Sequence, residues 1–335
     1  MKRFWDILRL RVERRKLIYR SYRKYYELTC VRDRTDKVQK SDLILFFCAR
    51  NEGPRLPYFF EYYRKIGVRH FFVVDNGSDD ESVPFLTNQE DCSFWTTTSS
   101  YKSSRFGMDW LTALQNKYAA GHWTLTVDPD EFLVFPHQDK RPFAALLDWL
   151  DASSQRSFGT LLLDLYPRGD ANSAFCRPGE NPLDVSPYFD AQNYQSRLEP
   201  FYQNIWVQGG PRQRVFFTDK PDRGPALNKI PLVKWQKGFV YRSSMHQLLP
   251  RALNVTYRFG PLAAPCGCLL HYKFLSSFAQ KAEEEIVRKQ HFAASREYRA
   301  YNESGSTELW TKNSVFYTGW QQLEKLGLMS RGDWV

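Results

Sequence analysis

The sequence lacks the long apolar runs, the leader and the cysteine spacing that mark membrane-spanning or secreted proteins. No apolar run approaches the about 18 residues that a membrane-spanning helix requires. The first ten residues have neither the continuous apolar core nor the cleavage site of a secretory signal. The six cysteines follow neither a disulfide nor a zinc-ligand rhythm. We therefore expect a cytoplasmic protein with reduced thiols, whose 335 residues, 42% of them hydrophobic, suffice for a full core.

Outside its first 40 residues the chain has almost no net charge. Residues 1–40 carry +9 of the formal net charge of +10, so the body offers no basic surface of the kind that binds nucleic acid, and we expect no nucleic-acid partner. Residues 2–28 mix aromatic and aliphatic side chains with Lys and Arg and contain no Pro or Gly, which predicts a basic amphipathic helix. Such a helix either lies peripherally on the anionic inner face of the cell membrane or packs on the main domain with its basic side in solvent.

Three apolar strand patterns each end in a polar cluster. They are 43–49 before Arg50-Asn51-Glu52-Gly53, 70–74 before Asp75-Asn-Gly-Ser-Asp79-Asp80, and 123–127 before Asp128-Pro-Asp130-Glu131. Because α/β sheets bind ligands outside the carboxyl ends of their strands, we expect these clusters to form one site. Several carboxylates at one point suit a hard divalent cation, and hence a phosphorylated substrate. The plain alternative is that each cluster is a solvated turn.

Strands alternate with helices along the first half of the chain. Beyond the strands above, the pattern predicts helices at 56–66, ended by Gly67, at 82 onward with Ser82 as cap, at 105–120 and at 142–150, and strands at 93–97, 132–135 and 159–166. This alternation predicts a mostly parallel sheet covered by helices on both faces.

The second half of the chain is less periodic. Residues 167–213 are rich in Pro, Asn, Asp and Tyr, which predicts a lid or an acceptor-binding segment, or else plain irregular structure. Short extended pieces are expected around Val215, at 232–235 and at 269–272, followed by a charged helix over 276–301 and a mixed, helical ending. We expect four parts: an amino-terminal helix and linker (1–40, the linker at 33–42), a core (41–166), an acceptor-binding and sheet-completing region (167–275) and a helical region (276–335).

The three polar clusters, together with Leu56-Pro-Tyr-Phe59 and Phe132, resemble the signature of glycosyltransferase family 2, most closely its bacterial branch, over residues 43–166. The resemblance implies an α/β fold of the GT-A type, a doubly wound, mostly parallel nucleotide-sugar-binding sheet with flanking helices. It also implies a transferase that uses Mn²⁺ or Mg²⁺. Such an enzyme moves a sugar, with inversion, from a nucleotide-diphosphate sugar to a hydroxyl acceptor. An acceptor on a lipid carrier, a glycolipid or a growing surface polysaccharide would also explain the basic amino terminus.

Matching the motifs residue by residue gives the expected site. The resemblance implies that the nucleotide is contacted by Asn51, Glu52, Asp75 and Asp79, and that the metal ion is bound by Asp128 and Asp130. Where the family usually carries a small residue this chain has Pro129, whose fixed φ could alter the spacing of the two carboxylates.

Several basic residues and histidines add to this set. Lys102 and Arg105 precede a predicted helix and suit a diphosphate at its amino terminus, or else are ordinary surface charges. Enzymes with the GT-A fold commonly supply a late histidine as a metal ligand, which makes His271 a candidate; a buried structural histidine is the alternative. His246 is a weaker candidate for contact with acceptor or phosphate.

No sequence motif identifies the catalytic base. Asp164 lies in an apolar strand, where burial would raise its pKa and make it a better base, although a structural, hydrogen-bonded role is the alternative. Glu199 and Asp190 in the long segment are rivals.

Two other functions share parts of this pattern. A nucleotidyltransferase has a similar fold, but it typically opens with a Gly-rich basic loop, and residues 50–54 contain a single glycine. A noncatalytic carbohydrate-binding protein could keep the fold. However, Asp128 and Asp130 are both present, and a protein that has lost its activity usually loses its metal ligands as well.

Overall fold

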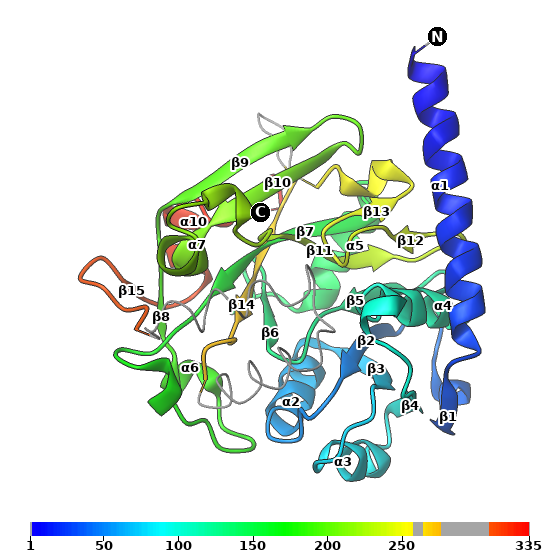
Figure 1. The fold of residues 1–335 in the computed structure, drawn as a ribbon, viewed down its shortest axis with the longest axis horizontal. Coiled ribbons are helices and arrows are strands. Elements are labelled where there is room, and N and C mark those ends of the chain that lie inside the picture. The colour runs from blue at the N-terminus through cyan, green and yellow to red at the C-terminus, as the bar shows by residue number, and fades with distance from the viewer. Residues whose placement is uncertain (1, 257–263, 276–307, 335) are drawn as a thin grey trace.

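The computed structural model describes residues 2–256, 264–275 and 308–334, and its centre is a nine-stranded sheet in the order β1-β4-β3-β2-β5-β11-β7-β14-β6 (Figure 1). The strands are β1 (Thr29–Arg32), β2 (Leu43–Ala49), β3 (Val68–Asp75), β4 (Cys92–Thr96), β5 (Trp123–Thr126), β6 (Glu131–Val134), β7 (Ser157–Asp164), β11 (Asn228–Lys234) and β14 (Gly267–His271). Six of them run in one direction, whereas β1, β6 and β11 run in the other. The predicted mixed α/β class with a large, mostly parallel sheet is confirmed.

Helices cover both faces of this sheet. They include α2 (Leu56–Ile66), α3 (Ser82–Asn88), α4 (Met108–Tyr118) and α5 (Phe143–Ala152). Side chains alternate across a strand, so Phe47 of β2 packs in one core layer with Phe59 of α2, while Phe46 belongs to the other layer with Leu114 of α4. Burial on both faces explains why β2 and β3 are almost continuously apolar.

The strand order reverses beside β2. The chain runs from β2 to β3 and β4 on one side, then returns to place β5 on the other side of β2. Open α/β sheets bind ligands at such a switch point, outside the carboxyl ends of the strands. The loops that follow β2 and β5 border this position, so the topology brings the first and third polar clusters together.

Local backbone geometry explains why one predicted helix boundary is confirmed and another is wrong. Helix α2 ends as predicted at Gly67, which adopts φ 111°. Helix α4 begins at Met108 rather than at residue 105, because Arg105, Phe106 and Gly107 all have positive φ (54°, 58° and 76°).

Ser82 does not cap α3, contrary to the prediction. It is the first residue of that helix, and its hydroxyl accepts the backbone N–H of Glu52 at 2.9 Å instead. The bond ties the loop after β2 to the loop after β3.

Residues 167–213 contain more regular structure than the sequence predicted. They include α6 (Pro182–Val185), β8 (Tyr188–Phe189), the hairpin strands β9 (Tyr194–Glu199) and β10 (Asn204–Gly209), and the start of α7 (Gly210–Phe216). The position predicted to be extended, Val215, is therefore helical. Most side chains of β9 are exposed, so the strand has no apolar alternation that would reveal it.

The remaining elements are short apart from the amino-terminal helix. They are α1 (Lys2–Tyr25), β12 (Val240–Tyr241), β13 (Leu248–Leu249), β15 (Val315–Phe316), α10 (Trp320–Lys325) and the 3₁₀ turns η1 (Thr35–Lys37), η2 (Lys102–Ser104), η3 (Ala171–Ser173), η4 (Pro221–Arg223) and η5 (Arg251–Asn254). Strand β15 pairs with β8. The strand predicted at 232–235 is the end of β11.

The amino-terminal helix is confirmed as α1, and it runs along one side of the molecule with its first turns beyond the body (Figure 1). The predicted linker contains η1, and β1 directly before it joins the edge of the sheet beside β4. The helix predicted at 276–301 lies outside the described residues, and the division into four parts stays a prediction. Among the helices the structure describes, none combines the length and apolar character needed to cross a bilayer.

Candidate functional site

The loops after β2 and β3 hold each other in place. The carboxylate of Asp75 is 1% exposed and accepts the N–H groups of Gly77 and Ser78 at 3.1 and 3.2 Å. The amide oxygen of Asn51 accepts the N–H of Asp79 at 3.0 Å, and its own N–H donates to Ser78 at 2.9 Å. The structure thus brings three of the predicted nucleotide residues together, but it uses the Asp75 carboxylate to shape the loop.

Glu52, the fourth predicted nucleotide residue, lies beside a cation. Its carboxylate accepts a hydrogen bond from Arg55 at 2.8 Å, at the start of α2. Both residues line the cavity described below.

A candidate metal-binding cluster forms at the turn that leads from β5 into β6, beside the end of β14. Asp130, Glu131 and His271 each offer a ligand atom, and these atoms lie within 4.8 Å of one another. The pairing of β6 with β14 places Glu131 directly opposite His271. The sequence named Asp130 and His271 as ligands, but it did not assign Glu131 to the metal although the motif contains it.

Asp128, the other predicted ligand, contacts a buried lysine that the sequence did not reveal. Lys229 Nζ lies 3.1 Å from Asp128 Oδ2 and also donates to Glu131. The Lys229 side chain is 5% exposed and comes from β11. Burial opposes its charge, but the two carboxylates outweigh burial and raise the pKa of Lys229. Lys229 therefore neutralises part of the acidic cluster from inside the sheet.

His271 is held between two carboxylates. Its Nδ1 lies 2.6 Å from Asp164 Oδ1, and its Nε2 lies 3.4 Å from Asp130 Oδ2. Arg212 in turn donates through Nε to Asp164 at 2.8 Å. In metal sites a carboxylate on one ring nitrogen of a histidine fixes the tautomer and aims the other nitrogen at the ion, and Asp164 is placed to do this for His271.

These contacts set the protonation states of the cluster. Burial disfavours the charged imidazole, but Asp130 and Asp164 outweigh burial and raise the pKa of His271 to about 9. Burial raises the pKa of Glu131 to about 7, against the opposing charge of Lys229. Burial also acts to raise the pKa of Asp130, but the charge and hydrogen bond of His271 hold it well below its usual range.

The expected rise in the pKa of Asp164 is wrong. Burial does oppose ionisation of this carboxyl, as the sequence suggested, but Arg212 and His271 outweigh burial, and the pKa is lowered. The geometry gives Asp164 the place of a positioning residue behind His271. Its predicted role as a base stays untested.

The donor set of the cluster fits a divalent ion. Two carboxylates and one imidazole provide oxygen and nitrogen ligands, and the Asp130 side chain is 20% exposed, so the cluster is reached by solvent at Asp130. Three protein ligands leave coordination positions for the oxygen atoms of a substrate.

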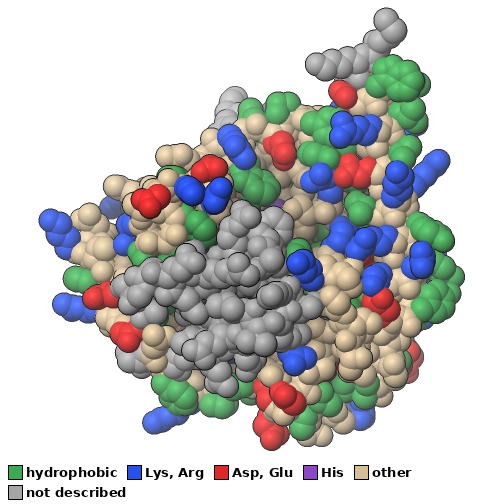
Figure 2. All heavy atoms as spheres, viewed as in Figure 1, with side chains coloured by type: hydrophobic (Ala, Val, Ile, Leu, Met, Phe, Trp, Pro, Cys, Tyr) green, Lys and Arg blue, Asp and Glu red, His purple; other side chains and the backbone are tan. Residues whose placement is uncertain are grey.

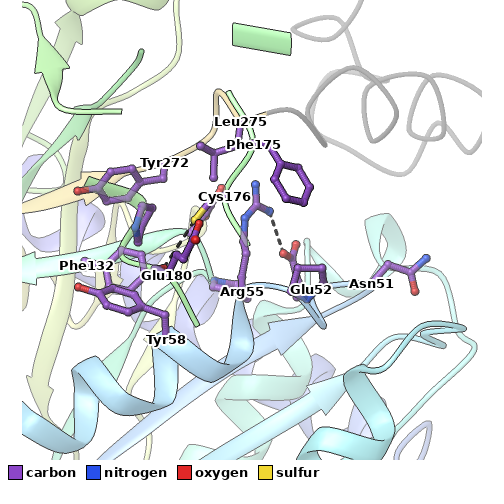
Figure 3. Close-up of a pocket in the computed structure, with 14 residues that line it drawn as sticks. Asn51, Glu52, Arg55, Tyr58, Phe132, Phe175, Cys176, Glu180, Tyr272 and Leu275 are labelled. Carbon is purple, nitrogen blue, oxygen red and sulfur yellow. Dashed lines mark hydrogen bonds and ion pairs between the residues drawn. The ribbon is translucent and has the colours of Figure 1, made fainter. Parts of the chain in front are cut away.

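A cavity of about 120 Å³ adjoins this cluster (Figure 3). Asp130 forms part of its wall, so the cavity and the cluster share a carboxylate. Aromatic rings of Tyr58, Phe132 and Tyr272 lie together on one side, and the Arg55 guanidinium extends toward Glu52 on the other. The cavity thus offers both flat apolar surfaces and charged groups within reach of the candidate metal centre.

The remaining predicted residues do not line this cavity. Arg105 donates to Asp109 at 2.8 Å and to the carbonyl of Tyr241 at 2.6 Å, which ties the start of α4 to β12. Lys102 lies in η2, the 3₁₀ turn directly before Arg105. Glu199 on β9 accepts a hydrogen bond from Gln247 at 2.9 Å.

Two other candidate residues, Asp190 and His246, form hydrogen bonds with residues outside the metal cluster. Asp190 is bound by Arg214 at 2.9 Å and by the Tyr166 hydroxyl at 2.5 Å. His246 Nδ1 lies 2.6 Å from the carbonyl oxygen of Asn228, and burial lowers the pKa of His246 to about 4. The functions predicted for all of these residues stay predictions.

No protein-family model and no curated protein matches this sequence. Among solved structures, HddC from Yersinia pseudotuberculosis is similar over 64% of this chain and 80% of that chain, with 10% identity and a TM-score of 0.29. A likeness this weak carries no argument about the function of this chain.

Proposed function

We propose that this protein is a metal-dependent glycosyltransferase of the GT-A type, similar to glycosyltransferase family 2, which moves a sugar from a nucleotide-diphosphate sugar to a hydroxyl acceptor with inversion. The observation that carries the proposal is the Asp130–Glu131–His271 cluster, which opens into a cavity beside the switch point of the sheet. A candidate metal centre beside a cavity at this position suits a diphosphate-bearing ligand.

In this proposal Asp130, Glu131 and His271 hold Mn²⁺ or Mg²⁺, and Asp128 stays a further candidate ligand. When bound, the ion supplies charge neutralisation for the diphosphate that leaves. Asp164 positions the imidazole of His271 through the 2.6 Å hydrogen bond to Nδ1. Lys229 balances the carboxylates on the buried side, so that the cluster is not an array of unpaired charges in the core.

The loops after β2 and β3 form the nucleotide side of the site. Asn51 lines the cavity and holds the Asp75–Asp79 loop, which is where we place the base and ribose. Arg55 adds a cation to the cavity wall for the diphosphate. Lys102 and Arg105 stay as further diphosphate candidates.

The aromatic wall forms the sugar or acceptor side. The rings of Tyr58, Phe132 and Tyr272 offer flat apolar faces, with the Tyr58 hydroxyl as a polar group. Such a wall suits a sugar ring or the first residue of a glycan or lipid-linked acceptor, as surface polysaccharide or glycolipid synthesis would require. Asp164 and Glu199 remain the named candidates for the base.

The proposal is tested by the turnover of a panel of nucleotide-diphosphate sugars with Mn²⁺, Mg²⁺ or EDTA. We expect slow donor hydrolysis that needs the metal and is lost in Asp130→Asn, while Asp222→Asn, which removes the charge of an exposed aspartate outside the cluster, keeps it. Equal turnover in the Asp130→Asn variant, with its fold intact, would exclude the metal assignment. Release of diphosphate from a nucleoside triphosphate and a sugar phosphate would instead identify a nucleotidyltransferase.

A further inference from the structure

Helix α1 carries an apolar stripe on the side that faces away from the body. The stripe consists of Phe4, Trp5, Leu8, Val12, Tyr19 and Tyr22, all of them exposed, and exposed Tyr26 continues it directly after the end of α1. At 3.6 residues per turn the six helical positions fall within a sector about 100° wide. Trp5 is 62% exposed and Tyr22 is 58% exposed, so the stripe is unburied near both ends of the helix.

The opposite side of α1 already provides the packing that the fold needs. Leu10 is buried against Val240 and Leu249, and Ser21 is buried where α1 meets α4. Most of the outward stripe lies outside this packing, and so many exposed aromatic side chains on one helix face mark an interaction site.

Basic side chains accompany the stripe. Arg11, Arg15, Lys16 and Arg23 lie within or beside the same sector and are exposed, and none has a hydrogen-bond or ion-pair partner in the part of the chain that the structure describes. Figure 2 shows Lys and Arg side chains interspersed with hydrophobic ones along α1. By contrast, Arg20, farther round the helix, pairs with Asp109 at 2.6 Å.

We propose that α1 lies in the interface of an anionic lipid bilayer, with the stripe among the upper acyl chains and the four bases on the lipid phosphates. Charge complementarity favours this occupant, because a second copy of α1 would bring like charges together on both sides of the stripe. Tyr and Trp side chains also prefer the boundary between hydrocarbon and water. The helix lies on the membrane without crossing it.

Sedimentation of the full-length protein with vesicles tests this proposal. We expect binding to vesicles of phosphatidylglycerol and phosphatidylcholine, and much weaker binding to phosphatidylcholine alone. Each base contributes about a fivefold change in partitioning, so changing Arg11, Arg15, Lys16 and Arg23 to Gln should weaken binding by at least tenfold and up to several hundredfold.

The matched control changes Lys40, Lys65, Arg69 and Lys220 to Gln, which removes the same charge from exposed positions outside α1. This control should bind almost as the wild type does. Replacing Phe4, Trp5 and Leu8 with Ser should weaken binding even at high salt, where the bases contribute least. Thermal unfolding confirms that each variant is folded.

Three results would overturn the proposal. One is the absence of binding to anionic vesicles by the wild type, and another is an equal loss in the α1 and control variants. The third is a dimer in sedimentation equilibrium that dissociates when the stripe is changed to Ser, since the stripe would then be the interface between two copies. None of these results bears on donor turnover, so the proposed function is tested separately.

Discussion

Replacing Asp164 with Asn separates a positioning role from a role as catalytic base. The carboxylate is 1% exposed and has two charged partners, Arg212 at 2.8 Å and His271 at 2.6 Å. Breaking a buried ion pair costs about 3–5 kcal/mol, and Asn keeps one oxygen for the imidazole, so we expect a loss near the low end, about 3 kcal/mol. For a chain of this size that loss lowers the melting temperature by on the order of 5 °C.

The same change should weaken metal binding. If Asp164 aims His271 at the ion, Mn²⁺ affinity falls by about 10- to 100-fold, as for other carboxylates behind metal-bound histidines. If Asp164 is instead the base, turnover falls by about 10²- to 10⁴-fold and Mn²⁺ affinity is unchanged. Titration calorimetry with Mn²⁺ measures the first quantity, and donor turnover at saturating Mn²⁺ measures the second.

Asp190→Asn is the matched control for this experiment. Asp190 is also a buried aspartate bound by an arginine, Arg214 at 2.9 Å, but it lies outside the metal cluster. It should lower stability without changing Mn²⁺ affinity. An Asp164→Asn protein that binds Mn²⁺ as tightly as the wild type would refute the positioning role.

The other predictions concern protonation, charge balance and packing. Burial lowers the pKa of His70 to about 4, so the imidazole binds a proton more weakly in the folded state than in the unfolded state. The folded state therefore keeps its full stability above pH 6.5 and loses the contribution of neutral His70 as the pH falls toward 4. Urea unfolding should therefore show that the wild type loses about 2 kcal/mol more than His70→Gln between pH 7 and pH 5. Lys229→Met leaves two carboxylates without their buried cation, so it should lower stability by about 3–5 kcal/mol, and Mn²⁺ should raise its melting temperature more than that of the wild type; an equal rise would contradict this. Gly107→Ala places a Cβ in steric clash with the sulfur of Cys48 at φ +76° and should cost about 2–4 kcal/mol. Gly121→Ala, at φ +95° with nothing within 4 Å, should cost only about 1 kcal/mol by the same unfolding measurement.

The sequence predicted the half of the fold in which periodicity and buried strands coincide. Strands β2, β3 and β5 are almost wholly buried, so their apolar runs were visible, and the polar residues after them marked the edge of the sheet. The site could be placed there because parallel strands share that edge. The same reasoning failed for β9, whose mostly exposed side chains carry no such pattern.

The parts of the site that come from distant segments could not be predicted. Lys229 lies in β11, where Pro231 obscures the strand signal and coincides with an irregularity in the pairing with β7. Arg212 has no motif and becomes a site residue only because α7 packs beside β7. The contacts of Asp164 with Arg212 and His271 reversed its expected pKa shift, since its burial could be inferred from the sequence but these contacts could not.

Binding of Mn²⁺ in the presence and absence of a nucleoside diphosphate tests the central claim most directly. The cluster of Asp130, Glu131 and His271 leaves coordination positions for phosphate oxygens, so the diphosphate should tighten Mn²⁺ binding, and Mn²⁺ should tighten diphosphate binding by the same factor. Calorimetry should show this coupling in the wild type and its loss in Asp130→Asn. Independent binding of the two ligands, or coupling that survives in Asp130→Asn, would contradict the account.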